Sequence, residues 1–193
     1  ILGIDHLELL EYADSGMEGW PQNDAPGSFW STPVDEGAMK LGALIEAYQP
    51  QVIVTYDENG FYGHPDHIQA HRITMAAVEQ TGTDAKVYWT TVPKSMFEQF
   101  RKMAQELLGE NWEAELPQDD GEVMEIGLPD EEITTWVDAT AYGAKKYAAL
   151  GAHASQSENI MFLQMGEEKF VEFMGHETFV RVRDTTNAPL PES

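Results

Sequence analysis

The sequence contains no cysteine among its 193 residues. Disulfide bonds and thiolate metal ligands are therefore excluded. Any metal ion must be held by histidine and carboxylate side chains instead.

Basic residues are also scarce, with 11 Lys and Arg against 34 Asp and Glu, which gives a formal net charge of −23. A chain this acidic repels phosphate backbones, so we expect no nucleic-acid partner. No apolar run approaches the ~20 residues that a membrane-spanning helix needs. We therefore expect a cytoplasmic protein without a membrane partner that acts on a small molecule, and a homo-oligomer is left open.

Apolar residues make up 42% of the chain, which is enough for a buried core. The first residue is Ile1, and an apolar stretch follows almost at once, so we expect no signal peptide. We expect a fragment that lacks its natural N-terminus.

Segments typical of strands and helices alternate along the chain. Runs rich in β-branched or aromatic residues predict strands at 6–12, 51–56, 86–92, 133–139 and 177–183. Apolar periodicity predicts helices at 32–49, 67–81, 94–109, 142–153 and 167–175. The strand at 51–56 is continuously apolar, so we expect it to be buried on both faces. This alternation predicts an α/β fold with a mainly parallel sheet flanked by helices.

The stretch "TYDENGFYGHPDHIQAHR", from Thr55 to Arg72, carries the candidate chemistry. Its polar loop leaves the carboxyl end of a strand, where open parallel sheets bind their ligands. His64 and His67 lie three residues apart across a helix start, and a neutral imidazole is the commonest nitrogen ligand of zinc. Asp66 could orient an imidazole, and Tyr62 could donate a hydrogen bond to an oxyanion.

Structural interpretations of the same residues stay open at this point. Asp66 could be the N-cap of the helix, His64 a satisfied loop histidine, and His71 a partly buried helix residue. Short H-x-x-H patterns also recur by chance. The H-E-x-x-H spacing of thermolysin-type proteases is absent, because residue 68 is Ile.

The segment "YDENGFYGHPDH" resembles the second motif of the LmbE-like, or PIG-L, zinc N-deacetylases. Within that family it is most similar to the actinobacterial mycothiol enzymes. The segments "LGIDHLELLEYADSGM", "ALGAHASQ" and "TTNAPLPES" resemble other parts of the same enzymes. The resemblance spans nearly the whole chain and implies a Rossmann-like fold.

The resemblance also implies a role for each residue of the motif. His67 would be a zinc ligand, with Fe²⁺ as the alternative metal. His64 would be the general acid, or the cation that stabilises the tetrahedral intermediate. Asp66 would tune a motif histidine, Tyr62 would bind the oxyanion, and Asp14 would bind sugar hydroxyls.

The family's first motif, A-H-P-D-D-E, supplies two further zinc ligands and a general base, and it does not occur in this chain. We therefore expect residues 1–193 to form a single, N-terminally truncated domain that lacks its first strand-loop-helix unit and is inactive alone. Phe61 stands where close relatives often have Gly.

The implied function is zinc-dependent hydrolysis of an amide on an amino sugar. Mycothiol S-conjugate amidase activity is the first expectation, with a thiol conjugate as substrate. The alternatives are a deacetylase of N-acetylglucosaminyl-inositol or another sugar, and a sugar-binding relative without catalysis.

Overall fold

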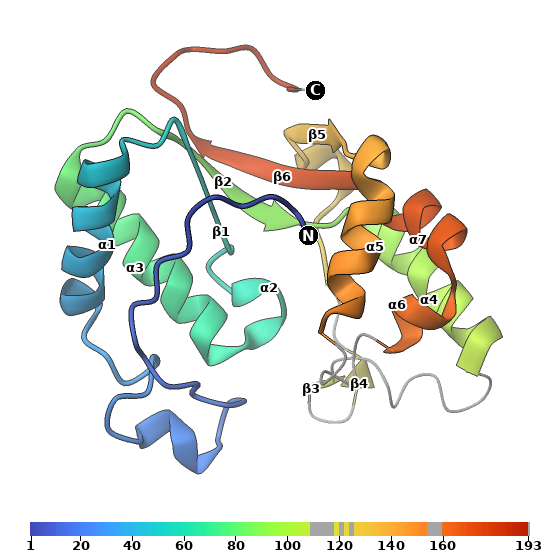
Figure 1. Cartoon of the computed structure of the whole chain (residues 1–193), viewed down its shortest axis with the longest axis horizontal. Helices are drawn as coiled ribbons and strands as arrows, with labels where there is room; N and C mark the ends of the chain where they lie inside the picture. The colour runs from blue at the N-terminus through green and yellow to red at the C-terminus, as the bar shows by residue number, and fades with distance from the viewer. Residues whose placement is uncertain (109–117, 120–121, 124–125, 154–159, 193) are drawn as a thin grey trace. The chain divides into compact units, whose positions relative to one another are not determined.

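The computed structural model describes residues 1–193 except 109–117, 120–121, 124–125, 154–159 and 193 (Figure 1). The chain divides into two compact units. Unit 1 comprises 1–8, 92–178 and 191–193, and unit 2 comprises 9–91 and 179–190. Part of the "ALGAHASQ" segment falls outside the described residues.

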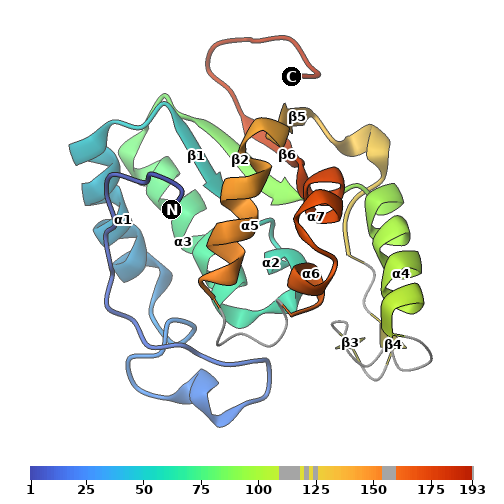
Figure 2. The ribbon, with the colours of Figure 1, turned by 45° about the vertical axis from the view of Figure 1, so that its right-hand side comes forward.

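Unit 2 contains a layer of two helices against parallel strands. Strand β1 (Val52–Thr55) pairs in parallel with β2 (Lys86–Thr91), so that Val52 lies opposite Lys86. Helices α1 (Val34–Tyr48) and α3 (Pro65–Thr81) lie side by side along these strands (Figure 2). The short α2 (Gly60–Gly63) joins β1 to α3, and η1 (Pro21–Asp24) lies in the loop before α1.

The core of unit 2 forms where small residues let α1 and α3 approach each other. It is made by Ala38, Ile45, Ala77, Val78 and Val87, all of them buried. Burial of these apolar surfaces is the main favourable term that holds the two helices on the strands. The start of α3 is thereby fixed at the end of β1.

Unit 1 is mainly helical. Its helices are α4 (Lys94–Leu108), α5 (Gly143–Gly151), α6 (Ile160–Gln164) and α7 (Glu167–Met174), with the turns η3 (Asp130–Glu132) and η4 (Thr140–Tyr142). Its strands are β3 (Gln118–Asp119) and β4 (Glu122–Val123), which form an antiparallel pair, and β5 (Thr135–Asp138). The larger sheet has the order β1-β2-β6-β5, and the boundary between the units falls within β6 (His176–Arg183).

The expected α/β, Rossmann-like class is confirmed, since a four-stranded open sheet is flanked by helices. Among the described residues, no helix combines the length and apolar character needed to cross a membrane. The single-domain expectation for 1–193 stays a prediction.

Two local expectations were wrong. Residues 6–12 form no strand: Leu7 and Leu9 are 81% and 75% exposed, so this segment buries no apolar face that would hold it against a sheet. Strand β1 is not buried on both faces: Val52 and Val54 are 52% and 54% exposed. A continuous apolar run therefore does not mean that both faces of this strand are buried, since only alternate side chains face α1 and α3.

Candidate functional site

The candidate site lies in unit 2, in the loop between β1 and α3. Asp57 opens this loop, and its Oδ1 accepts hydrogen bonds from the backbone N–H groups of Asn59 and Phe61, at 3.0 and 2.9 Å. Gly60 follows with a φ of +62° and is buried against α3. A Cβ there would lie 2.7 Å from the backbone nitrogen of Ile68, so only glycine lets the loop approach the helix this closely.

His67 lies in the first turn of α3, and its ring is fixed from two sides. Its Nδ1 is 3.1 Å from the carbonyl oxygen of Gly60. Its ring also stacks on Tyr56, with ring centres 4.0 Å apart and planes 4° from parallel. Because a carbonyl oxygen only accepts hydrogen bonds, Nδ1 carries the proton, and Nε2 keeps its lone pair.

The electrostatic surroundings of His67 favour its neutral form. Burial is the main cause that lowers the pKa of His67 below its ordinary value, and the neighbouring His64 acts in the same direction. The hydrogen bond to Gly60 and the charge of Asp66 oppose this shift. A neutral imidazole with an accessible lone pair is the form that binds metal ions.

His64 has the opposite arrangement of protons. It is the N-cap of α3, and its Nδ1 accepts a hydrogen bond from the backbone N–H of Asp66 at 3.1 Å. Since Nδ1 acts as an acceptor, Nε2 carries the proton and can donate it. The two rings lie 4.9 Å apart, so the site brings together one donor and one acceptor imidazole.

Asp66 connects α3 to the loop that carries Asp14. It is the second residue of the helix, so the interpretation of Asp66 as the N-cap was wrong, because His64 occupies that position. Its Oδ2 accepts the backbone N–H of Ser15 at 3.1 Å. Its Oδ1 is buried and has no hydrogen-bond partner in the described part of the chain.

Asp14 is exposed and lies beside these groups. Its Oδ1 accepts the N–H of Gly16 at 2.8 Å, which is a turn-forming contact. Possible ligand atoms of Asp14, His64 and Asp66 all lie within 4.8 Å of one another. His67 is not part of this group, although its ring neighbours that of His64.

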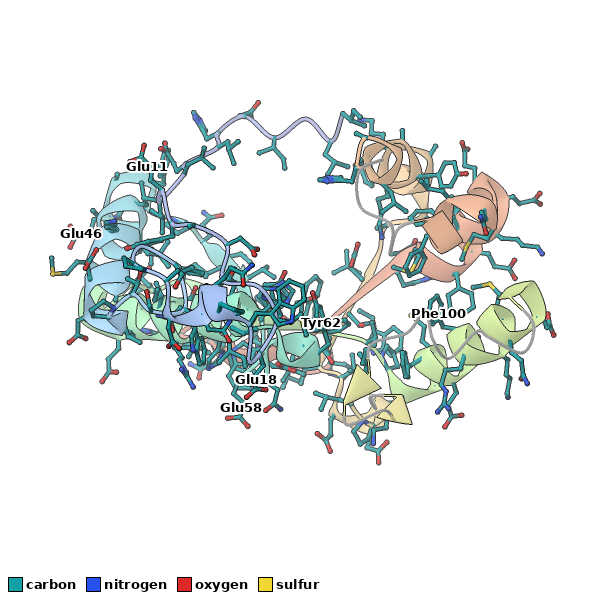
Figure 3. The ribbon with its side chains drawn as sticks, turned by 90° about the horizontal axis from the view of Figure 1, so that it is seen from below. Glu11, Glu18, Glu46, Glu58, Tyr62 and Phe100 are labelled. Atoms are coloured by element: carbon teal, nitrogen blue, oxygen red, sulfur yellow. The ribbon has the colours of Figure 1, made fainter. Side chains whose placement is uncertain are left out.

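Tyr62 extends the site as an aromatic cluster. Its ring meets that of His67 edge-on at 5.0 Å and that of His64 at 6.1 Å. Tyr62 projects from α2, while the exposed Glu58 precedes it in the same loop (Figure 3). The structure thus brings Tyr62, His64 and His67 together.

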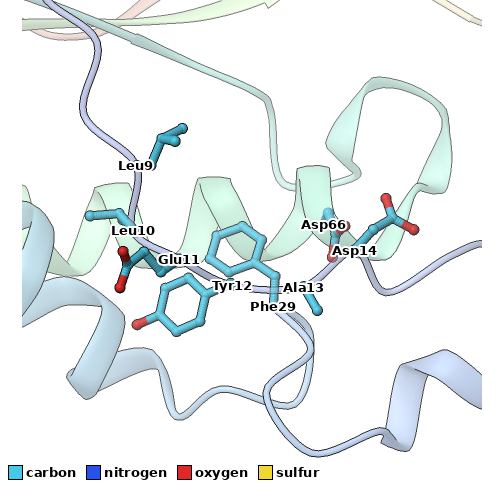
Figure 4. A pocket seen from close by; sticks show the side chains of 8 residues that line it. All are labelled: Leu9, Leu10, Glu11, Tyr12, Ala13, Asp14, Phe29 and Asp66. Carbon is cyan, nitrogen blue, oxygen red and sulfur yellow. The ribbon is translucent and has the colours of Figure 1, made fainter.

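An open cavity of about 470 Å³ adjoins the carboxylates (Figure 4). Its lining is apolar along Leu9, Leu10, Tyr12, Ala13 and Phe29, with Glu11, Asp14 and Asp66 as its acidic members. The hydroxyl of Tyr12 is buried, and the ammonium group of Lys40 lies 4.2 Å from the centre of the Tyr12 ring.

Some residues of the site carried no clear signal in the sequence. Tyr56 stacks on His67, and its position at the very end of the predicted strand was the only available hint. Ser15 is fully buried and holds both Asp66 and the backbone N–H of Trp30, but "DSG" alone indicated only a turn. His71 donates from Nδ1 to the carbonyl oxygen of Tyr56, which agrees with its structural interpretation.

Comparison with known proteins gives a consistent picture. Residues 1–78 match the family model described as PIG-L, GlcNAc-PI de-N-acetylase. Three similar relatives carry the name 1D-myo-inositol 2-acetamido-2-deoxy-alpha-D-glucopyranoside deacetylase. Those from Geodermatophilus obscurus, Salinispora arenicola and Acidothermus cellulolyticus are 40%, 41% and 46% identical to the chain.

These alignments cover much of the chain but less of each relative. They include 94%, 92% and 80% of this chain, in the same order. The corresponding shares of the relatives are 67%, 60% and 54%. The chain therefore spans between half and two thirds of the length of these curated relatives.

Proposed function

Because this chain belongs to the PIG-L, or LmbE-like, family, we propose that it forms part of a metal-dependent hydrolase that cleaves an amide on an amino sugar. The observation that carries the proposal is the pair of imidazoles with opposite tautomers. His67 presents a lone pair and His64 presents an N–H, at neighbouring positions on one helix start. Amide hydrolysis needs both a metal ligand or base and a proton donor.

The residues present fit a divalent cation. Nε2 of His67 keeps an available lone pair, and Oδ1 of the adjacent residue Asp66 is buried without a hydrogen-bond partner in the described residues. We propose that His67 holds the ion through Nε2. Nitrogen and carboxylate ligands suit Zn²⁺ and Fe²⁺ alike, and Zn²⁺ is the metal that we propose. Such an ion supplies Lewis-acid polarisation of the amide carbonyl.

The other side chains have defined tasks in this proposal. Tyr62 donates its phenolic O–H to the oxygen on which negative charge develops. The N–H at Nε2 of His64 gives its proton to the departing amine. Asp66 positions Asp14, because its carboxylate accepts a hydrogen bond from the backbone of Ser15 and thereby holds the loop that carries Asp14. Asp14 accepts hydrogen bonds from sugar hydroxyls.

Further ligands and a general base are proposed to come from an A-H-P-D-D-E segment outside these residues. Zinc in catalytic sites takes three protein ligands, and His67 alone cannot retain it. We therefore propose that residues 1–193 form most of one deacetylase domain and are inactive when expressed alone.

The substrate is proposed from the relatives' names and from the site. Those names support deacetylation of an N-acetylglucosaminyl-inositol. Mycothiol S-conjugate amidase activity is the second candidate, because the aromatic cluster continues beyond Tyr62 to Phe61 and offers an apolar surface to a larger acyl group. The cytoplasmic location and the oligomeric state stay predictions.

The test uses the full-length protein that contains this chain. Purified protein loaded with Zn²⁺ or Fe²⁺ is given N-acetylglucosaminyl-inositol and a mycothiol S-conjugate, and the released amine is measured. Release from either substrate supports the proposal. A metal-loaded, folded protein that releases amine from neither would overturn it.

A further inference from the structure

Phe61 has a backbone conformation that its side chain disfavours. Its φ is 67° and its ψ is −52°, inside the turn labelled α2. For a bulky residue such a positive φ is an outlier, because the Cβ crowds the neighbouring carbonyl oxygen. Gly60 and Gly63 on either side also have positive φ values, of 62° and 83°, but have no Cβ. Phe61 is therefore the strained position in a turn that otherwise uses glycine.

Hydrogen bonds to the backbone of the surrounding loop hold this conformation. Oδ1 of Asp57 accepts the N–H of Phe61, and the N–H of Gly63 donates to the carbonyl oxygen of Asn59 at 2.9 Å. These are contacts of the backbone, and a glycine at position 61 could make the same ones without strain. Strained residues that persist in this way concentrate at functional sites.

The ring of Phe61 lies at the aromatic end of the site. It meets Tyr62 edge-on, with ring centres 6.4 Å apart and planes at 81°. Tyr62 in turn meets His64 and His67. The ligand atoms of Asp14 lie within 4.8 Å of those of His64 and Asp66. These contacts connect Phe61 through Tyr62 and His64 to the carboxylates of Asp14 and Asp66.

We propose that Phe61 is a specificity-determining residue whose ring contacts the acyl group of the amide substrate. This inference rests on the proposed function. An N-acyl amino sugar is rich in hydroxyl groups on its amine side, which suits Asp14, and rich in carbon on its acyl side, which suits an aromatic surface. Contact with the ring accordingly raises kcat/KM for acyl groups larger than acetyl relative to its value for acetyl.

The experiment compares two substrates on the full-length, metal-loaded protein. N-acetyl- and N-phenylacetyl-glucosaminyl-inositol are given to the wild type, Phe61→Gly and Phe61→Leu, and kcat/KM is measured for each. The quantity of interest is the ratio of the phenylacetyl value to the acetyl value. Loss of the ring is expected to lower this ratio about tenfold in Phe61→Gly, with a smaller fall in Phe61→Leu.

Gln49→Gly serves as the matched control for strain relief. Gln49 has a φ of 48° at the exposed C-terminal cap of α1, and its replacement is expected to leave the ratio unchanged. An equal fall in kcat/KM for both substrates would show that Phe61 only orients Tyr62, and would overturn the inference. If the wild type cleaves both substrates and the Phe61 variants have the same ratio as the wild type, the inference is also overturned, but the proposed function is left intact. Cleavage of neither substrate by the wild type would overturn the inference, and failure to cleave a mycothiol S-conjugate as well would overturn the proposed function.

Discussion

Gly60 is the position where a single added carbon tests the geometry of the site most directly. A Cβ there would lie 2.7 Å from the backbone nitrogen of Ile68 and 2.8 Å from Cβ of His67. Both neighbours belong to the first turn of α3, which the core of unit 2 holds in place. In Gly60→Ala, the loop must therefore move away from the helix.

The expected cost has two parts. An alanine at a φ of +62° gives up about 1–2 kcal/mol relative to glycine, because of the left-handed conformation. Relief of the overlap with the helix backbone adds about 1–3 kcal/mol, the usual range for overpacking. The free energy of unfolding is thus expected to fall by about 2–5 kcal/mol.

The same movement affects the metal ligand. The carbonyl oxygen of Gly60 holds Nδ1 of His67, so a displaced loop releases one of the two contacts that fix the ring. Loss of such a supporting hydrogen bond typically weakens metal binding about 10–100-fold. We expect Gly60→Ala to show a loss of zinc affinity in this range, measured by chelator competition on the full-length protein.

Gly82→Ala is the matched control. Gly82 has a φ of +61°, almost the same as Gly60, but a Cβ there would meet nothing within 4 Å. Denaturant unfolding of the two variants separates the conformational cost, which both share, from the overlap, which only Gly60→Ala has. Equal destabilisation of both variants, with zinc affinity unchanged in each, would refute the close packing of the loop on α3.

Three further predictions concern the site and its support. His64→Ala is expected to lower turnover about 10²–10³-fold while zinc content survives, whereas His67→Ala is expected to lower zinc occupancy; the reverse pattern in metal analysis would exchange their roles and favour a cation between Asp14, His64 and Asp66. Burial lowers the pKa of His67 below its ordinary 6.5, so the unfolded chain binds this proton more tightly, and metal-free stability is expected to fall as the pH drops below that value. Urea unfolding at about pH 7.5 and about pH 5.5 should show a smaller loss in His67→Gln than in the wild type, and equal losses would contradict the shift. Gln69→Leu removes the buried amide that donates to the carbonyl oxygen of Thr32 at 2.7 Å, and should cost about 1–3 kcal/mol by urea unfolding, while the exposed Gln80→Leu on the same helix should cost little.

The sequence predicted those parts of the fold that depend on local signals. Helix α3 ends at Thr81 with Gly82 in the left-handed conformation, as the glycine indicated. Strands β1 and β2 also lie where their β-branched runs placed them. The segment 6–12 was mistaken for a strand because its composition fits one, whereas its apolar side chains Leu7 and Leu9 are exposed, and composition does not encode burial.

The clustering of the site could be predicted only in part. Tyr62, His64, Asp66 and His67 lie within six residues, so their proximity follows from the motif itself. Asp14 reaches them through the contact between Ser15 and Asp66, which joins residues 51 positions apart. Periodicity and turn chemistry are local and give no signal for such a contact.

The stacking of His67 on Tyr56 also could not be predicted from the sequence, because it depends on how the folded chain packs. The ring centres are 4.0 Å apart, and Tyr56 itself is partly buried, which raises its pKa above the ordinary value. Nothing in the sequence distinguished this tyrosine from a residue that simply ends a strand.

The partial exposure of β1 has a practical consequence for handling these residues in solution. In the described part of the chain β1 is bonded to β2 alone and is an edge strand, and one of its faces shows two half-exposed valines. Open borders of this kind can recruit a second polypeptide and promote precipitation. A net charge of −23 opposes such encounters through mutual repulsion. At low ionic strength the molecules should therefore stay apart. At high salt concentration they should associate, because salt screens that repulsion.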